Sequence, residues 1–163
     1  MRQAMSCACQ TWNNAGMANA TELKFGDPAT RVAQSAYWTV LLRPRQPTLG
    51  SLVLVCREDV RAFSAVSAAA FADLQHVVRR IEACLHEVVA YERINYLMLM
   101  MVDPDVHFHV IPRYAVPRDF AGQQYADTGW PGQPALEPAV VPDESARALL
   151  LERLIGGWNH AGN

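Results

Sequence analysis

Residues 105–113 read DVHFHVIPR, a stretch in which two histidines alternate with apolar residues and an aspartate stands two positions before the first of them. Alternate side chains of a β-strand point to opposite faces of its sheet, so Asp105, His107 and His109 should share one face. The intervening apolar residues should face the core. Because imidazole is the side chain best suited to acid, base or nucleophilic chemistry near neutral pH, this face is the first candidate for a functional site.

The segments around the histidine strand predict a mixed α+β fold. Strands that cluster around one long helix favour an antiparallel sheet rather than alternating β-α units. The short connection into the histidine strand likewise predicts an antiparallel neighbour. We expect strands over residues 37–42, 52–56 and 95–101, one long helix over residues 67–91, and a C-terminal helix from Asp143 to about Ile155, before Gly156 and Gly157.

The length of 163 residues suits one domain. Residues 1–22 lack hydrophobic periodicity and are expected to form a flexible N-terminal arm, which leaves residues 23–163 as a single domain. Residues 115–142 are rich in proline, glycine and aspartate and predict a long loop.

Composition excludes several classes of protein. Hydrophobic residues make up 51% and charged residues 18% of the chain, which indicates a globular domain. The net charge of −2 gives no support to a nucleic-acid-binding surface, and no apolar run approaches the roughly 20 residues of a membrane span. The four cysteines lack the spacing of a zinc site, and we expect free thiols in a cytoplasmic protein: Cys7, Cys9, Cys56 and Cys84.

Three kinds of site could explain the two histidines. A two-histidine, one-carboxylate metal site is opposed by geometry, because Asp105 and His109 would lie about 13 Å apart along the strand. Buried histidines that bond to neighbouring backbone are a second possibility. The third is covalent catalysis on phosphorus, in which one imidazole attacks a phosphate while an acceptor holds its other N–H, and a second group on the same face stabilises the phosphate oxygens.

The stretch 105–113 resembles the signature of the histidine triad (HIT) family, His-φ-His-φ-His-φ-φ with φ apolar, often followed by Pro-Arg. The order of a hairpin, a long helix and two strands is also similar to that family, over roughly residues 36–114. Gly50-Ser51 resembles the Gly-His that precedes a family strand. Asn95-Tyr96 begins twelve residues before His107, as in bacterial members.

The resemblance implies a function and a role for each histidine. His107 would be the nucleophile that forms a nucleotidyl-histidine intermediate, and His109 would contact the phosphate being transferred. The implied activity is that of a nucleotide hydrolase or nucleotidyl transferase, acting on dinucleoside polyphosphates, nucleoside phosphoramidates or sugar nucleotides. A homodimer that needs no metal or cofactor for this step is implied as well.

The chain departs from the family pattern at four positions. Asp105 stands in place of the first histidine, and Ser51 in place of a histidine that lies near it. Arg43 stands where an acidic or amide residue usually holds the ribose, and Met101 falls near the place of a polar residue that assists the leaving group. The negative charge of Asp105 would oppose a bound phosphate, which Arg43 could offset by pairing with Asp105 or by binding phosphate itself.

These observations give two expectations for function. The first is a HIT-type hydrolase with His107, His109 and Asp105 in the catalytic site. The second is a HIT-like nucleotide-binding protein in which catalysis is weak or lost. In either case the candidate nucleotide-binding residues are Arg43, Ser51, Asn95 and Arg113.

Overall fold

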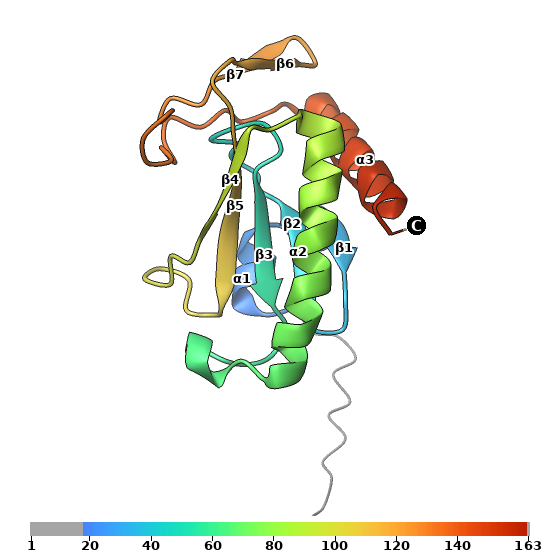
Figure 1. Cartoon of the computed structure of the whole chain (residues 1–163), viewed down its shortest axis with the longest axis vertical. Coiled ribbons are helices and arrows are strands. Elements are labelled where there is room, and N and C mark those ends of the chain that lie inside the picture. The colour runs from blue at the N-terminus through green and yellow to red at the C-terminus, as the bar shows by residue number, and fades with distance from the viewer. Residues whose placement is uncertain (1–17, 163) are drawn as a thin grey trace, which may run out of the picture.

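A computed structural model describes residues 18–162 of the chain. They form one five-stranded antiparallel sheet in the order β1-β2-β3-β5-β4 and a separate hairpin, β6-β7, which confirms the expected α+β class (Figure 1). The elements are α1 (Ala20–Lys24), β1 (Arg31–Gln34), β2 (Trp38–Leu42), β3 (Leu52–Cys56), a 3-10 turn (Phe63–Ala65), α2 (Ala68–Val89), β4 (Arg93–Leu97), β5 (His107–Arg113), β6 (Arg118–Phe120), β7 (Gln123–Tyr125) and α3 (Glu144–His160).

Residues 1–17 of the expected N-terminal arm lie outside the described residues. The described remainder of that segment contains the beginning of α1, at Ala20. None of the helices within residues 18–162 has the length and apolar character needed to cross a bilayer.

The histidine strand lies between two antiparallel neighbours, as expected. β5 pairs with β3 on one side, where His107 faces Val55 and His109 faces Val53. On its other side β5 pairs with β4, where His109 faces Leu97. The strands expected over residues 37–42 and 52–56 correspond to β2 and β3, which pair as an antiparallel hairpin.

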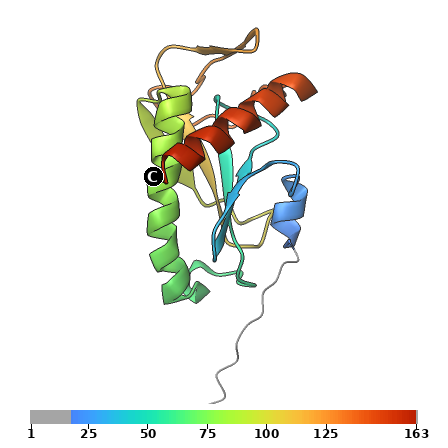
Figure 2. The same ribbon diagram turned by 90° about the vertical axis from the view of Figure 1, so that its right-hand side faces the viewer.

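The sheet separates a large core from a small one. α2 and α3 cover one face, and α1 lies on the opposite side of the sheet (Figure 2). Alternate residues of the central strands contribute to each side, as the two-residue period of a strand requires. The small core contains Leu41, Val53 and Val55 with Phe25 packed against it, and this is the face that carries the two histidines.

The long helix α2 follows from its apolar spacing and its caps. Val77, Ile81 and Leu85 recur every four residues and are buried against the sheet. Ser67 caps the start by accepting a hydrogen bond from the backbone N–H of Ala70 at 3.1 Å. The predicted limits of residues 67–91 therefore agree with the observed helix to within two residues at each end.

The predicted end of the last helix near Ile155 was wrong, because α3 continues through Gly156 and Gly157 to His160. The glycines predicted a stop, but Gly157 serves close packing of two helices. A Cβ atom there would lie 3.1 Å from the Sγ of Cys84 on α2. The guanidinium of Arg80 also stacks 4.2 Å from the ring centroid of Trp158, which favours continuation of α3 along α2.

The strand expected over residues 95–101 is shorter and begins earlier. β4 ends at Leu97, and the pairing of Leu97 with His109 is its last contact with β5. The apolar run that follows suggested more strand, but a backbone segment without a pairing partner cannot extend a sheet. Met101 is instead 96% exposed in the connection to β5.

Candidate functional site

His107 and His109 lie next to each other on the face opposite α2, and they are called the histidine pair below. Their ring centroids are 5.2 Å apart and their planes are nearly perpendicular. Phe25, the residue that ends α1, packs on both rings with centroid distances of 6.4 Å to His107 and 5.7 Å to His109. The three rings form one compact cluster in which both histidines are buried.

The hydrogen bonding of His107 determines which of its nitrogens can act as a nucleophile. Nδ1 lies 2.7 Å from the backbone carbonyl oxygen of Asp105. A carbonyl can only accept, so Nδ1 carries the hydrogen and the neutral ring has its lone pair on Nε2. Nε2 is buried and has no hydrogen-bond partner within the described part of the protein. Its lone pair is therefore not engaged in a hydrogen bond within the described residues, although the ring is buried.

His109 is held in its neutral form. Burial lowers its pKa to about 4, and the positive charge of Arg43 acts in the same direction. Its Nδ1 is also buried without a partner among the described residues. A neutral His109 can donate one hydrogen bond to a phosphate oxygen through whichever nitrogen carries its proton.

The depressed pKa of His109 should make the protein less stable in mild acid. Between pH 6.5 and 4 the unfolded chain binds a proton at His109, whereas the folded chain does not. The free energy of unfolding should therefore fall as the pH drops through this window, by up to about 3 kcal/mol. Urea unfolding of wild type and His109→Gln at pH 7 and pH 4.5 checks this, since the variant should lose distinctly less stability. An equal loss in both proteins would contradict it.

Asp105 does not direct its carboxylate toward the histidine pair. Oδ2 accepts hydrogen bonds from the backbone N–H and the hydroxyl of Thr21, at 3.1 and 2.8 Å. Only its backbone carbonyl reaches His107. Among the described residues the carboxylate of Asp105 therefore bonds to Thr21 of α1 and forms no ion pair with Arg43.

Arg43 lies on the same face as the histidine pair. Strand alternation places it two residues beyond Leu41, and its positive charge contributes to the low pKa of His109. Nη1 donates to the carbonyl oxygen of Arg45 at 2.7 Å, whereas Nε is buried without a partner among residues 18–162. Burial lowers the pKa of Arg43. The guanidinium thus has hydrogen-bonding capacity that the described protein does not fill.

Ser51 belongs to the internal structure of the loop between β2 and β3. Its hydroxyl donates to the carbonyl oxygen of Thr48 at 2.8 Å, and its backbone N–H and carbonyl both bond to the side chain of Gln46. The preceding Gly50 adopts a φ of +78°, and a Cβ atom there would lie 2.6 Å from Cγ2 of Val89. These contacts shape the loop between β2 and β3, and they engage the hydroxyl and backbone of Ser51 within that loop.

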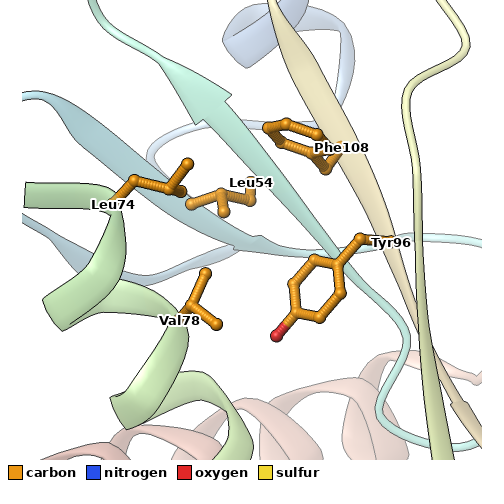
Figure 3. Close-up of a pocket in the computed structure, with 5 residues that line it drawn as sticks. All are labelled: Leu54, Leu74, Val78, Tyr96 and Phe108. Carbon is orange, nitrogen blue, oxygen red and sulfur yellow. The ribbon is translucent and has the colours of Figure 1, made fainter. Parts of the chain in front are cut away.

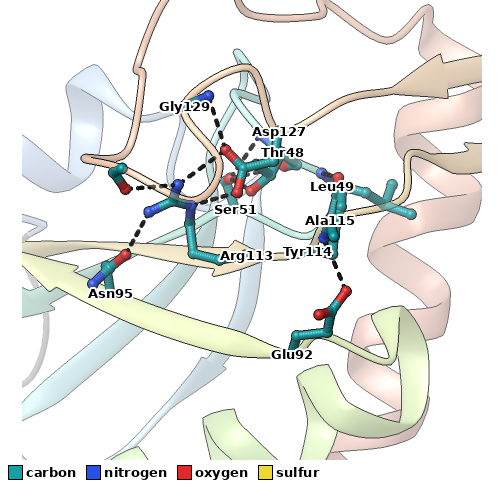
Figure 4. Close-up of polar contacts among 11 residues, drawn as sticks. Thr48, Leu49, Ser51, Glu92, Asn95, Arg113, Tyr114, Ala115, Asp127 and Gly129 are labelled. Carbon is teal, nitrogen blue, oxygen red and sulfur yellow. Dashed lines mark hydrogen bonds and ion pairs between the residues drawn. The ribbon is translucent and has the colours of Figure 1, made fainter.

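Arg113, which ends β5 four residues beyond His109, forms a polar network with Asn95 (Figure 4). Arg113 is 4% exposed, and its guanidinium donates to both carboxylate oxygens of Asp127, to Oδ1 of Asn95 and to the carbonyl oxygen of Gly132. Asp127 and Gly132 lie in the long segment after β5. Four of the five N–H groups of Arg113 are thereby engaged, and they hold this segment to the sheet.

An apolar hollow of about 140 Å³ lies on the other side of the sheet from the histidine pair. Its lining is drawn in Figure 3 and consists of Leu54, Leu74, Val78, Tyr96 and Phe108. Phe108 points to the α2 side because it alternates with the two histidines. A phosphate would find no ion-pairing group in this lining, so the hollow is not the candidate site.

No group of three or more His, Cys, Asp and Glu side chains within residues 18–162 could hold a metal ion. Two residues that the sequence did not identify, Thr21 and Phe25, contribute to the candidate site. Thr21 lies in the segment expected to form a flexible arm, and Phe25, a lone aromatic residue before Gly26, carries no pattern that indicates packing on a distant strand.

The comparisons with known proteins agree with this fold. A structure of a histidine triad protein from Sinorhizobium meliloti is similar, with 19% identity and a TM-score of 0.68, covering 86% of this chain and 96% of that one. One from Bradyrhizobium japonicum has 19% identity and a TM-score of 0.61, covering 80% and 88%. The diadenosine triphosphate hydrolase of Plasmodium falciparum has 8% identity and a TM-score of 0.54, covering 83% and 78%.

A comparison with curated proteins gave no match. The structural similarities, all below 25% identity, establish a shared fold. The family is shown by sequence, because the HIT domain matches residues 27–116, more than half of the chain. The chain therefore belongs to the HIT domain family.

Proposed function

We propose that the protein is a nucleotide hydrolase or nucleotidyl transferase that acts through a covalent intermediate at Nε2 of His107. The observation that supports this most is the hydrogen bond of Nδ1 to the carbonyl of Asp105, which leaves the lone pair on Nε2. The proposed substrates are dinucleoside polyphosphates or related nucleotide conjugates. The likeness in fold to a diadenosine triphosphate hydrolase is in keeping with that class.

The proposed reaction has two steps. Nε2 of His107 attacks the phosphorus of the nucleotidyl group, and the bridging P–O or P–N bond breaks, with its electron pair going to the leaving group. The ring then carries a positive charge, which the carbonyl of Asp105 stabilises through the Nδ1 hydrogen. Water then attacks the same phosphorus and releases a proton to solvent. The P–N bond to His107 breaks, its electron pair returns to Nε2, and the nucleoside monophosphate leaves as the ring becomes neutral again.

Arg43 is the proposed partner of the substrate's phosphate charge. A buried N–H without an acceptor costs about 1–3 kcal/mol, which a phosphate oxygen bound to Nε would recover. A guanidinium can hold phosphate through two parallel hydrogen bonds. His109 would donate a further hydrogen bond to the transferred phosphate. The networks around Ser51 and around Asn95 and Arg113 suggest that these three residues support the site indirectly.

Incubation with a panel of nucleotides tests the proposal. We expect wild type to release a nucleoside monophosphate from a dinucleoside polyphosphate or an adenosine phosphoramidate, measured by liquid chromatography. Absence of turnover across the panel, together with a thermal shift caused by a nucleoside monophosphate, would instead support nucleotide binding without efficient catalysis. That second candidate is favoured by the burial of His107, which is 0% exposed, because a phosphate can reach Nε2 only after a covering side chain moves.

We also propose a homodimer as the working assembly. β4 is an edge strand, and its open side could pair with a second copy. Tyr96 of β4 and the apolar hollow beside it lie at the same edge, and they would gain cover from such a neighbour. The mass in solution from light scattering would decide the oligomeric state.

A cytoplasmic location is proposed as well, in keeping with the buried free thiols of Cys56 and Cys84.

A further inference from the structure

A chain of hydrogen bonds connects Asp105 to the aromatic ring that covers the histidine pair. Oδ2 of Asp105 accepts from both the backbone N–H and the hydroxyl of Thr21. The carbonyl oxygen of Thr21 in turn accepts from the backbone N–H of Phe25 at 3.1 Å. Phe25 then packs on His107 and His109. Three residues thus connect the start of β5 to the cover of the candidate site.

The connection is buried, which makes it costly to break. Thr21 is 1% exposed and Asp105 is 6% exposed. A buried carboxylate requires hydrogen-bond donors, and a buried hydroxyl or N–H that loses its acceptor costs about 1–3 kcal/mol. If the side chain of Asp105 turned toward a substrate, both donors of Thr21 would lose their acceptor. The two negatively charged groups would also repel each other.

We propose that Asp105 positions α1, and through it Phe25, over the histidine pair instead of contacting a substrate phosphate. In this proposal α1 and Phe25 form one wall of the site, and Asp105, the residue in place of the first histidine, fixes that wall. That this wall borders a reaction site rests on the proposed function. The positioning of α1 itself does not depend on any activity.

Among the described residues two other long-range polar contacts hold α1 and its N-terminal cap, and both are weaker candidates for this task. The side chain of Asn19 donates to the carbonyl oxygen of Cys56 at 2.9 Å, and Lys24 forms an ion pair with Asp103. The side chain of Lys24 is 48% exposed, and exposed ion pairs contribute little to stability. The contact of Asp105 with Thr21 is the one that combines a charge, two hydrogen bonds and burial.

The pKa of His109 reports whether the wall is in place. Burial lowers this pKa to about 4, and the charged or titratable groups that act on the ring are Arg43, His107, Asp103 and Lys24. Release of α1 would expose the ring and move Lys24 away, and both changes raise the pKa. Loss of the carboxylate of Asp105 without release of α1 would instead lower the pKa of a nearby imidazole. The direction of the change therefore separates positioning from simple loss of charge.

Titration of the imidazole C–H signals by NMR tests the proposal. In Asp105→Ala the pKa of His109 should rise from about 4 toward the ordinary value of about 6.5, by roughly one unit or more. Thr21→Val, which removes one donor and keeps the shape of the side chain, should cause a smaller rise. Asp105→Asn keeps an acceptor for Thr21, so the pKa should stay at or below the wild-type value.

Asp143→Ala is the matched control, because Asp143 is a carboxylate that caps α3 away from the site, with Oδ1 accepting from Ala146 at 2.8 Å. It should lower the melting temperature and leave the pKa of His109 unchanged. If Asp105→Ala does not fold, Thr21→Val decides the question. An unchanged or lower pKa of His109 in both Asp105→Ala and Thr21→Val would overturn the proposal. Since no turnover is measured, this outcome is independent of whether the protein hydrolyses nucleotides.

Discussion

Replacement of His107 by alanine is expected to lower the turnover of a dinucleoside polyphosphate by a factor on the order of 10⁴ or more, equivalent to about 5.5 kcal/mol in the activation barrier. The reason is that the proposed mechanism forms the bond to phosphorus at Nε2 of His107, whose free lone pair depends on the hydrogen bond from Nδ1 to the carbonyl oxygen of Asp105. His109 cannot take over this role from its own position on the strand, two residues further along the same face. The rate of nucleoside monophosphate release, compared at saturating substrate, is the measurement.

Two further variants make this prediction specific to covalent catalysis. His107→Gly with added imidazole should regain part of the activity, because free imidazole can enter the vacated space and attack the phosphorus. His76→Ala removes an exposed histidine on α2 and should keep wild-type activity. Wild type quenched during turnover should carry an acid-labile nucleotidyl group on His107 in mass spectrometry. Equal activity in wild type and His107→Ala would exclude the covalent mechanism at this residue.

The fold could be predicted from sequence to the extent that local patterns determined it. Three local patterns each predicted one kind of element, and the structure has all three elements. These patterns are the apolar runs of β2 and β3, the spacing of apolar residues in α2 and the alternation in residues 105–113. The predictions failed where long-range packing overruled a local signal. Gly157 did not end α3 because the small residue allows close contact with α2, and the apolar run after Leu97 did not extend β4 because its partner strand had ended.

The sequence predicted the residues of the candidate site that lie on β5, but it did not predict their contacts with α1. Alternation alone placed His107 and His109 on one face. The partner of Asp105 could not be found in the same way, because Thr21 lies 84 positions earlier in a segment without periodicity. The sequence indicated only nucleotide binding for Arg113, since an aspartate in a loop of unknown conformation gives no sign that it will pair with a particular arginine.

Loss of Arg113 is expected to have the largest effect on stability among the substitutions considered. Its ion pair with Asp127 is almost fully buried, at 4% and 1% side-chain exposure. Arg113→Ala would leave the carboxylate of Asp127 buried without its cation, which typically costs about 3–5 kcal/mol. Asp127→Ala should cost a similar amount for the converse reason. The midpoint and slope of urea unfolding, followed by circular dichroism, give the change in the free energy of unfolding.

Two kinds of control accompany this prediction. One compares the buried ion pair with an exposed ion pair, and the other tests whether Arg113 binds nucleotide. Arg45 and Glu137 form an exposed ion pair, with side chains 56% and 59% accessible, so Arg45→Ala should leave the unfolding midpoint nearly unchanged. The double variant Arg113→Met/Asp127→Leu should be more stable than either single alanine variant, because no charge is left unpaired in the interior. If Arg113 supports the fold rather than the nucleotide, its variants should bind a nucleoside monophosphate with nearly wild-type affinity at temperatures where they remain folded. A large loss of affinity without loss of stability would instead make Arg113 a ligand contact, and would require Asp127 to release it when nucleotide binds.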